Sequence, residues 1–343
     1  MIRHPLMLSV AALDLLCLAA LAAAVVALFP VLVRWQPGAA DSKQLAAERG
    51  AEAGVLLVRF SGAALALSTL LLIVGFSLVL PDAVPGAMCG TGVLQAAGPL
   101  GSRAIFFRLL ALLGLSTWSL LEDLNRSRPE AVLTETTARI FAAISPLALL
   151  AVWYTAQAMW GIDFGRPVDC CATVYDPVYA ASAGKGVLSD RFWVLAFSAA
   201  TLLLGAAALG VRRTDHRIRR RWSWPLAGLT LFWVTAAAGA LVNVFSAYIF
   251  GVLAHDCPWC LFLPEHGMVG FVQFGALAVA AREGIPAPAA SFAAFAHPLL
   301  AGPAADRIRT AAGRILLSMA VFLVFSGGPA LLWRLRHGVW ISG

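Results

Sequence analysis

Long apolar runs separated by short polar segments make up most of this chain. Eight runs approach or exceed the roughly 20 apolar residues that a helix needs to cross a hydrocarbon core of about 30 Å. They cover residues 7–33, 55–80, 104–121, 135–160, 192–211, 224–254, 261–281 and 311–333. Their apolar positions are continuous rather than alternating, which favours helices over barrel strands. We therefore predict an all-α polytopic membrane bundle of about eight transmembrane helices, forming one membrane domain over residues 1–343.

The distribution of charged residues predicts which loops lie on which side of the membrane. Only 13% of the residues are charged, and the net charge is +7. The most basic segment, Arg212 to Arg221, lies between two apolar runs, so the positive-inside rule places it in the cytoplasm. Alternation then predicts cytoplasmic loops at 34–54, 122–134, 212–223 and 282–310, and outer loops at 81–103, 161–190 and 255–260. The positive-inside rule thus accounts for the net positive charge, so the charge does not indicate a nucleic-acid partner. We expect the protein to contact membrane lipid.

Residues Asp41 to Ala53 carry a helical pattern inside the first cytoplasmic loop. Asp41 or Ser42 is suited to cap this helix, because both side chains can accept a hydrogen bond from an unpaired backbone N–H. We expect a short cytoplasmic helix here. No Walker A, Rossmann, G-x-S-x-G or H-E-x-x-H motif is present, so nothing in the sequence indicates nucleotide hydrolysis.

The cysteines are distributed unevenly. Cys17 lies in the first apolar run and is expected to pack as a small apolar residue. The other five all fall in predicted outer loops: Cys89, Cys170, Cys171, Cys257 and Cys260. Disulfides form and persist in the bacterial periplasm. We therefore predict a multi-pass protein of the bacterial inner (cytoplasmic) membrane whose cysteine loops face outward.

Cys257 and Cys260 form a C-P-x-C motif where an outer loop meets the start of an apolar run. This spacing places the two sulfurs within one helical turn. The first turn of a helix offers unpaired N–H groups and a positive dipole end, both of which stabilise a thiolate. A thiolate that is accessible and has a low pKa is what thiol–disulfide exchange requires.

In this motif the chain resembles integral membrane thiol oxidoreductases of the DsbB and vitamin K epoxide reductase type. Cys257 and Cys260 match the pair that exchanges electrons with a quinone in those families. The resemblance implies a relay to a thioredoxin-like periplasmic partner, for which Cys89, Cys170 and Cys171 are the candidates. Arg108 is predicted near the outer end of its helix, where it is a candidate to hold a quinone oxygen. Its alternative is to snorkel towards the headgroups.

Two other interpretations of the cysteines remain open. Structural disulfides could join Cys89 to Cys170 or Cys171, and Cys257 to Cys260. A metal site could use the same cysteines with His255 and His266, which flank the motif: Cys and Met favour Cu(I), whereas Cys with His suits Zn or an iron–sulfur centre. In either case the protein would be a non-enzymatic membrane subunit of a larger transporter or respiratory assembly.

Overall fold

The computed structural model describes residues 4–39, 41–168, 188–251 and 257–340. These residues form helices and no strands. Seven helices in this part of the chain are long and apolar enough to cross a membrane: Pro5–Arg34, Ser42–Val79, Pro99–Arg126, Thr134–Gly161, Asp190–Arg213, Arg219–Phe250 and Pro298–His337. The predicted all-α polytopic membrane bundle is therefore confirmed.

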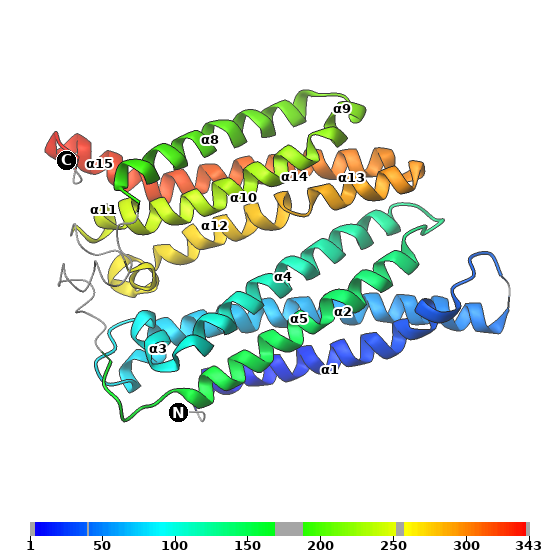
Figure 1. Cartoon of the computed structure of the whole chain (residues 1–343), viewed down its shortest axis with the longest axis horizontal. Helices are drawn as coiled ribbons and strands as arrows, with labels where there is room; N and C mark the ends of the chain where they lie inside the picture. Colours follow the sequence, from blue (N-terminus) through cyan, green and yellow to red (C-terminus); the bar gives the residue numbers. More distant parts are fainter. Residues whose placement is uncertain (1–3, 40, 169–187, 252–256, 341–343) are drawn as a thin grey trace. The chain divides into compact units, whose positions relative to one another are not determined.

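The helices follow one another along the chain as drawn in Figure 1. The α-helices are α1 (Pro5–Arg34), α2 (Ser42–Val74), α3 (Gly90–Ala97), α4 (Pro99–Arg126), α5 (Thr134–Gly161), α8 (Asp190–Arg213), α9 (His216–Arg221), α10 (Ser223–Ala240), α11 (Ser246–Phe250), α12 (Val269–Gly284), α13 (Ala287–Ala296), α14 (Ala301–Phe322) and α15 (Gly328–His337). Three long helices continue into π-helical segments: Gly75–Val79, Leu241–Phe245 and Leu323–Gly327. Short 3₁₀ turns cover Pro81–Ala83, Pro258–Phe262, Pro264–His266 and Pro298–Leu300.

The chain divides into two compact units. Unit 1 comprises Met1–Gly75, Leu94–Asp163 and Phe292–Pro303, and unit 2 comprises Phe76–Val93, Phe164–Ser291 and Ala304–Gly343. No boundary between them is visible in the sequence, because both units are built from apolar helices of the same kind.

Unit 1 is built around α1, α2, α4 and α5, which lie alongside one another (Figure 1). Helix α1 packs along α2, α4 packs along α5, and the contacts of α1 with α5 and of α2 with α4 close the ring. Small residues line much of the shared core, among them Cys17, Ala24 and Ala111, all fully buried. Small side chains let membrane helices approach closely, so dispersion contacts hold the ring together. Cys17 is thus a packing residue, as predicted.

Helix α2 corrects one expectation about the first loop. Residues 41–53 do not form a separate helix, because α2 runs without a break from Ser42 to Val74. Asp41 is the cap: its carboxylate accepts a hydrogen bond from the backbone N–H of Gln44 at 2.7 Å. Hydropathy alone cannot detect such a continuation, because the helix remains regular where its surface changes from apolar to polar.

In unit 2, α10 packs against both α8 and α12. Helix α12 also contacts the π segment Leu323–Gly327, and α11 contacts α15. Gln273 of α12 donates to the backbone carbonyl of Phe325 at 3.0 Å, which satisfies a carbonyl inside that π segment. The sequence predicts a span at 261–281, but α12 begins only at Val269 and has 16 residues, or about 24 Å at the usual rise per residue. The run predicted at 261–281 therefore forms a shorter helix preceded by two 3₁₀ turns, and α12 is not among the seven helices long enough to cross a membrane.

Candidate functional site at three cysteines

Three of the predicted cysteines converge in unit 2. The Sγ atoms of Cys89 and Cys257 lie 3.4 Å apart, although the residues are 168 positions apart in the sequence. The Sγ atom of Cys260 completes a group whose atoms all lie within 4.8 Å of one another. Four of the seven spans lie between Cys89 and Cys257 along the chain, and an even number of crossings returns the chain to the same side. We call these three residues the cysteine cluster.

The C-P-x-C motif forms a 3₁₀ turn and not the first turn of an α-helix. The backbone N–H of Cys260 donates to the carbonyl of Cys257 at 3.3 Å. A second 3₁₀ turn follows at Pro264–His266, and Gly267 and Met268 then adopt left-handed backbone angles (φ 67° and 52°) before α12 begins. Prolines lack the N–H that would extend a helix, so the chain forms short turns here. The motif thus begins a 3₁₀ turn where the start of an α-helix was expected, and the backbone N–H of Cys260 in this turn still lowers the pKa of Cys257.

Gly90, the residue after Cys89, brings the two cysteine segments together. A Cβ atom at Gly90 would stand 2.4 Å from Cε3 and 2.5 Å from Cδ2 of Trp259. The indole of the C-P-x-C motif therefore lies directly on the backbone at the start of α3, and only glycine leaves room for it. Trp259 also packs against Phe76 and Phe262, at ring-centroid distances of 6.0 and 5.9 Å.

The three sulfurs differ in their access to solvent. Cys89 and Cys260 are buried, with 1% and 8% of their surface exposed, whereas Cys257 is half-buried. Phe250, Trp259 and Leu263 pack around them. Cys257 is thus the cysteine of the cluster that an incoming reagent meets first, and the aromatic neighbours shield the other two.

Hydrogen bonds rather than a helix dipole determine the acidity of Cys257. Hydrogen bonds with the side chains of Cys260 and Cys89 lower its pKa to about 3, whereas burial acts in the opposite direction and raises it. Thr91 Oγ1 lies 3.0 Å from the same sulfur and acts in the same direction. The pKa of Cys260 is raised, first by its hydrogen bond to Cys257 and then by the one to Cys89. These opposite shifts of pKa favour a thiolate at Cys257 and a protonated thiol at Cys260.

Arg108 lies within the core of unit 1, where it is fully buried. It does not snorkel. Its Nε donates to Thr155 at 2.8 Å, one terminal nitrogen donates to Ser68 and Thr69, and the other pairs with the carboxylate of Asp14. These partners come from α1, α2 and α5, so one guanidinium on α4 joins all four helices of the ring. These contacts already occupy the hydrogen-bond donors of Arg108 with protein groups. A role for Arg108 in holding a quinone oxygen stays a prediction.

The remaining site predictions fall partly outside the described residues. Cys170, Cys171 and His255 lie in segments that the structure does not describe. His266 is described, and its ring lies edge-on against Phe250 at a centroid distance of 4.5 Å. Among the described residues, the metal-capable group at this site consists of the three cysteines alone.

Sequence reasoning missed two members of the site. Gly90 and Thr91 directly follow Cys89, but neither belongs to a recognisable motif. Their roles depend on where Trp259 and Cys257 come to lie, and those residues are four spans further along the chain. No local signal could have identified them.

The geometry of the cluster fits two kinds of chemistry. A disulfide needs an S–S distance of about 2.05 Å, which the sulfurs of Cys89 and Cys257 can reach from 3.4 Å by a small side-chain rotation. A zinc–sulfur bond of about 2.3 Å places two sulfurs of a tetrahedral site roughly 3.8 Å apart. The observed spacing lies between these values, so thiol exchange and metal binding are both sterically possible.

Comparison with protein-family models, with curated proteins and with solved structures finds no match to this chain.

Proposed function

We propose that this protein is a membrane thiol–disulfide oxidoreductase in which Cys257 is the exchanging cysteine. The observation that carries the proposal is the convergence of three sulfurs on one another, with Cys257 as the most exposed and most acidic member. A nucleophilic thiolate with a second thiol nearby is the arrangement that disulfide exchange requires. Cys260 lies one turn away, and Cys89 Sγ lies 3.4 Å away.

The position of Cys257 between two partners suggests how electrons would pass. Cys257 would form a disulfide with Cys260 in one state and with Cys89 in another. Formation of either disulfide from the Cys257 thiolate and one thiol releases two electrons and one proton, and a quinone that accepts these and takes a second proton from water becomes a hydroquinone. In the opposite direction, a thioredoxin-like partner in the periplasm would supply its own two thiols and become a disulfide.

Cys170 and Cys171 are the proposed relay to that partner. They follow Val168 closely in the sequence, and the backbone N–H of Val168 donates to the carbonyl of Pro85 at 2.9 Å. Pro85 in turn precedes Cys89 by four residues. The described chain that leads to the relay cysteines is therefore attached to the segment that carries Cys89. This attachment supports the relay.

Electron transfer to a quinone tests the proposal directly. Purified protein, reduced and freed of reductant, is mixed with a water-soluble quinone, and the loss of quinone absorbance is followed. We expect one two-electron equivalent per oxidised dithiol, and loss of the reaction in Cys257→Ser. Cys17→Ala is the matched control, because Cys17 is a buried packing residue of unit 1. Equal reaction in Cys257→Ser and in the native protein would overturn the proposal.

A second candidate rests on the same three sulfurs. Thiolates favour Cu(I) and Zn, and three of them within 4.8 Å could hold such an ion in a non-enzymatic subunit of a larger membrane assembly. In that case Cys89, Cys257 and Cys260 would bind the metal together. Stoichiometric copper or zinc in the purified protein, lost when any one of the three cysteines is replaced by serine, would favour this candidate.

A further inference from the structure

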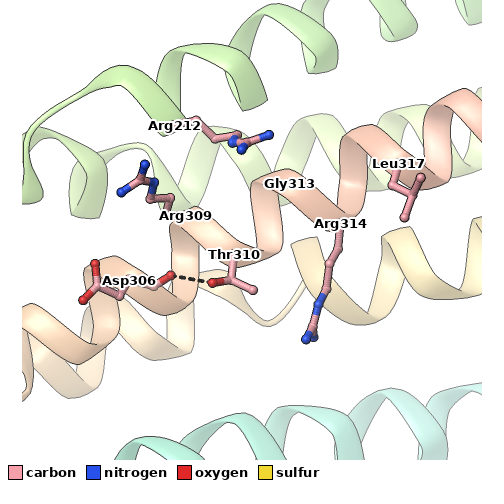
Figure 2. A pocket seen from close by; sticks show the side chains of 7 residues that line it. All are labelled: Arg212, Asp306, Arg309, Thr310, Gly313, Arg314 and Leu317. Carbon is pink, nitrogen blue, oxygen red and sulfur yellow. Dashed lines mark hydrogen bonds between the residues drawn. The ribbon is translucent and has the colours of Figure 1, made fainter.

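A cleft lined by arginines lies in unit 2, where the end of α8 meets α14. It has a volume of about 600 Å³. Its lining residues are Arg212, Asp306, Arg309, Thr310, Gly313, Arg314 and Leu317. The side chains of this set are shown in Figure 2. Three arginines and one aspartate give the lining a net charge of +2 (3 − 1).

The two helices approach one another at a glycine that lines the cleft. The guanidinium of Arg212 reaches across α14, and a Cβ atom at Gly313 would stand 3.8 Å from its Cζ and Nη1 atoms. Figure 2 shows Arg212 extending from α8 over this turn of α14. Further along the same pair of helices, a Cβ at Gly205 would lie 3.7 Å from Cε of Met319. The two helices are therefore antiparallel neighbours, and the cleft lies at one end of their contact.

Two of the arginines are available for a ligand. Arg212 and Arg309 are exposed. Among the side chains that the structure describes, neither is joined to another by an ion pair or hydrogen bond. Arg314, in contrast, donates to Glu283 at 2.9 Å and is already part of an ion-pair network with Arg307. Asp306 lies 3.7 Å from Arg219, which offsets part of its charge.

The lining changes from charged to apolar along α14. Thr310, Gly313 and Leu317 follow one another at intervals of three and four residues, so they share one helix face. Leu317 is 66% exposed, and Val324, two turns further on, is 65% exposed. Arg212 lies one residue before the end of Asp190–Arg213, a helix long and apolar enough to cross a membrane. The end of such a helix is where lipid headgroups would lie, so the cleft would offer arginines to a headgroup and an apolar surface to its acyl chain.

We propose that this cleft binds the phosphate of an anionic phospholipid, held by Arg212 from α8 and Arg309 from α14, with an acyl chain along Leu317. Guanidinium groups bind phosphate oxygens in bidentate geometry, and basic pockets between membrane helices accept anionic headgroups. Free phosphate has the same anionic chemistry as the headgroup, but it has no acyl chain that could contact Leu317. The site is independent of the proposed function.

Lipid binding to the purified full chain tests this proposal. Native mass spectrometry of delipidated protein in detergent would measure the affinity for phosphatidylglycerol and for phosphatidylcholine. We expect phosphatidylglycerol to bind more tightly, and the double variant Arg212→Gln/Arg309→Gln to bind it about tenfold more weakly or worse. Arg213→Gln is the matched control, because Arg213 shares the last turn of α8 but does not line the cleft.

A second pair of variants tests the space in the cleft without changing its charge. Gly313→Leu would place a bulky side chain in the cleft beside Arg212 and should weaken phosphatidylglycerol binding, whereas Gly313→Ala adds only a Cβ at ordinary contact distance and should not. Equal affinity for the two lipids, or equal loss in Arg213→Gln and in the double variant, would overturn the proposal. So would inorganic phosphate that displaces phosphatidylglycerol at comparable concentration, because it would identify a site for a free anion.

Discussion

Gly90 is the single residue on which the geometry of the cysteine cluster depends most closely. Because Trp259 lies 2.4 Å from where its Cβ would be, Gly90→Ala must displace the indole and the C-P-x-C turn that carries it. We expect a loss of about 1–3 kcal/mol in unfolding free energy, as for other overpacked sites. We also expect slower disulfide formation between Cys89 and Cys257. Thermal unfolding and thiol trapping measure the two effects.

Gly275→Ala provides the control for this substitution. Gly275 lies in α12 with no atom within 4 Å of a Cβ built there. Alanine in a helix is favoured over glycine by roughly 0.5–1 kcal/mol, so this variant should be as stable as the native protein or more so. Unchanged cysteine chemistry in Gly90→Ala would show that Trp259 does not position the cluster.

Cys257 is expected to react at a rate that hardly depends on pH. At pH values below its pKa of about 8.5, an ordinary thiol reacts about tenfold faster for each unit by which the pH rises, because the thiolate fraction rises. The pKa of Cys257 is lowered to about 3, so its thiolate is already formed throughout the range of about pH 5 to 8. Alkylation with iodoacetamide, read at the Cys257 peptide by mass spectrometry, should therefore give a nearly flat profile.

Two of the side chains that lower this pKa can be removed together. In Cys89→Ala/Cys260→Ala the Cys257 sulfur loses both thiol hydrogen bonds, and its pKa should return towards the ordinary value of 9.0. The tenfold rise per pH unit should then reappear. A steep profile in the native protein would contradict the assignment of Cys257 as a thiolate.

At the scale of helices, the sequence predicted the crossings well and their ends poorly. α1, α4, α5 and α8 agree with the predicted runs within a few residues. α14 begins at Ala301, ten residues before the predicted span, because its first turns carry charges that look like a loop. Arg307 pairs with the buried carboxylate of Glu283 at 2.7 Å, a contact between helices that hydropathy cannot foresee.

The buried ion pair between Asp14 and Arg108 is expected to contribute strongly to the stability of the helix ring in unit 1. Asp14→Leu would leave the Arg108 guanidinium charged and buried with only hydroxyl partners from Ser68, Thr69 and Thr155. Removing one partner of a buried pair costs about 3–5 kcal/mol. We expect a loss of that size in the free energy of unfolding, measured by titration with a denaturing detergent.

Two comparisons separate this pair from an ordinary surface contact. Asp123→Asn removes the exposed partner of Arg59 and should cost less than about 1 kcal/mol. Asp14→Leu/Arg108→Met removes both buried charges and should recover most of the stability. If that double variant is stable but no longer reduces quinone, Arg108 has the cofactor role that the sequence suggested. If it reduces quinone normally, Arg108 is purely structural.

At the scale of the whole molecule, we make a prediction about which side of the membrane carries the cysteine cluster. The described spans return Cys89 and Cys257 to one face, and the basic segment after α8 predicts that this face is outside. A membrane-impermeant maleimide should therefore label Cys257 in spheroplasts. It should label a cysteine placed at Arg128, in the predicted loop 122–134, only after the membrane is opened. The reverse pattern would invert the topology.

The sequence predicts those parts of the site that lie close together along the chain, and not those that meet only in the fold. Cys257 and Cys260 form a motif that is visible locally, whereas Cys89 was one candidate among three. The place of Cys89 in the cluster depends on the packing of Trp259 against Gly90, and four spans separate these two residues along the chain. Composition and periodicity report where a helix lies in a membrane but not which neighbour it meets, so the cluster could be suspected from the sequence but not assembled.

The redox and metal state of the cysteine cluster tests the central claim most directly. Purified protein would be equilibrated over a series of redox buffers, trapped with an alkylating reagent and analysed for bonds among Cys89, Cys257 and Cys260, with elemental analysis of the same sample. We predict a disulfide at Cys257 that forms and breaks reversibly, at a potential above about −300 mV, since structural bridges usually lie below that value. A bridge that resists reduction, or a stoichiometric metal ion on three unreactive thiolates, would contradict the account.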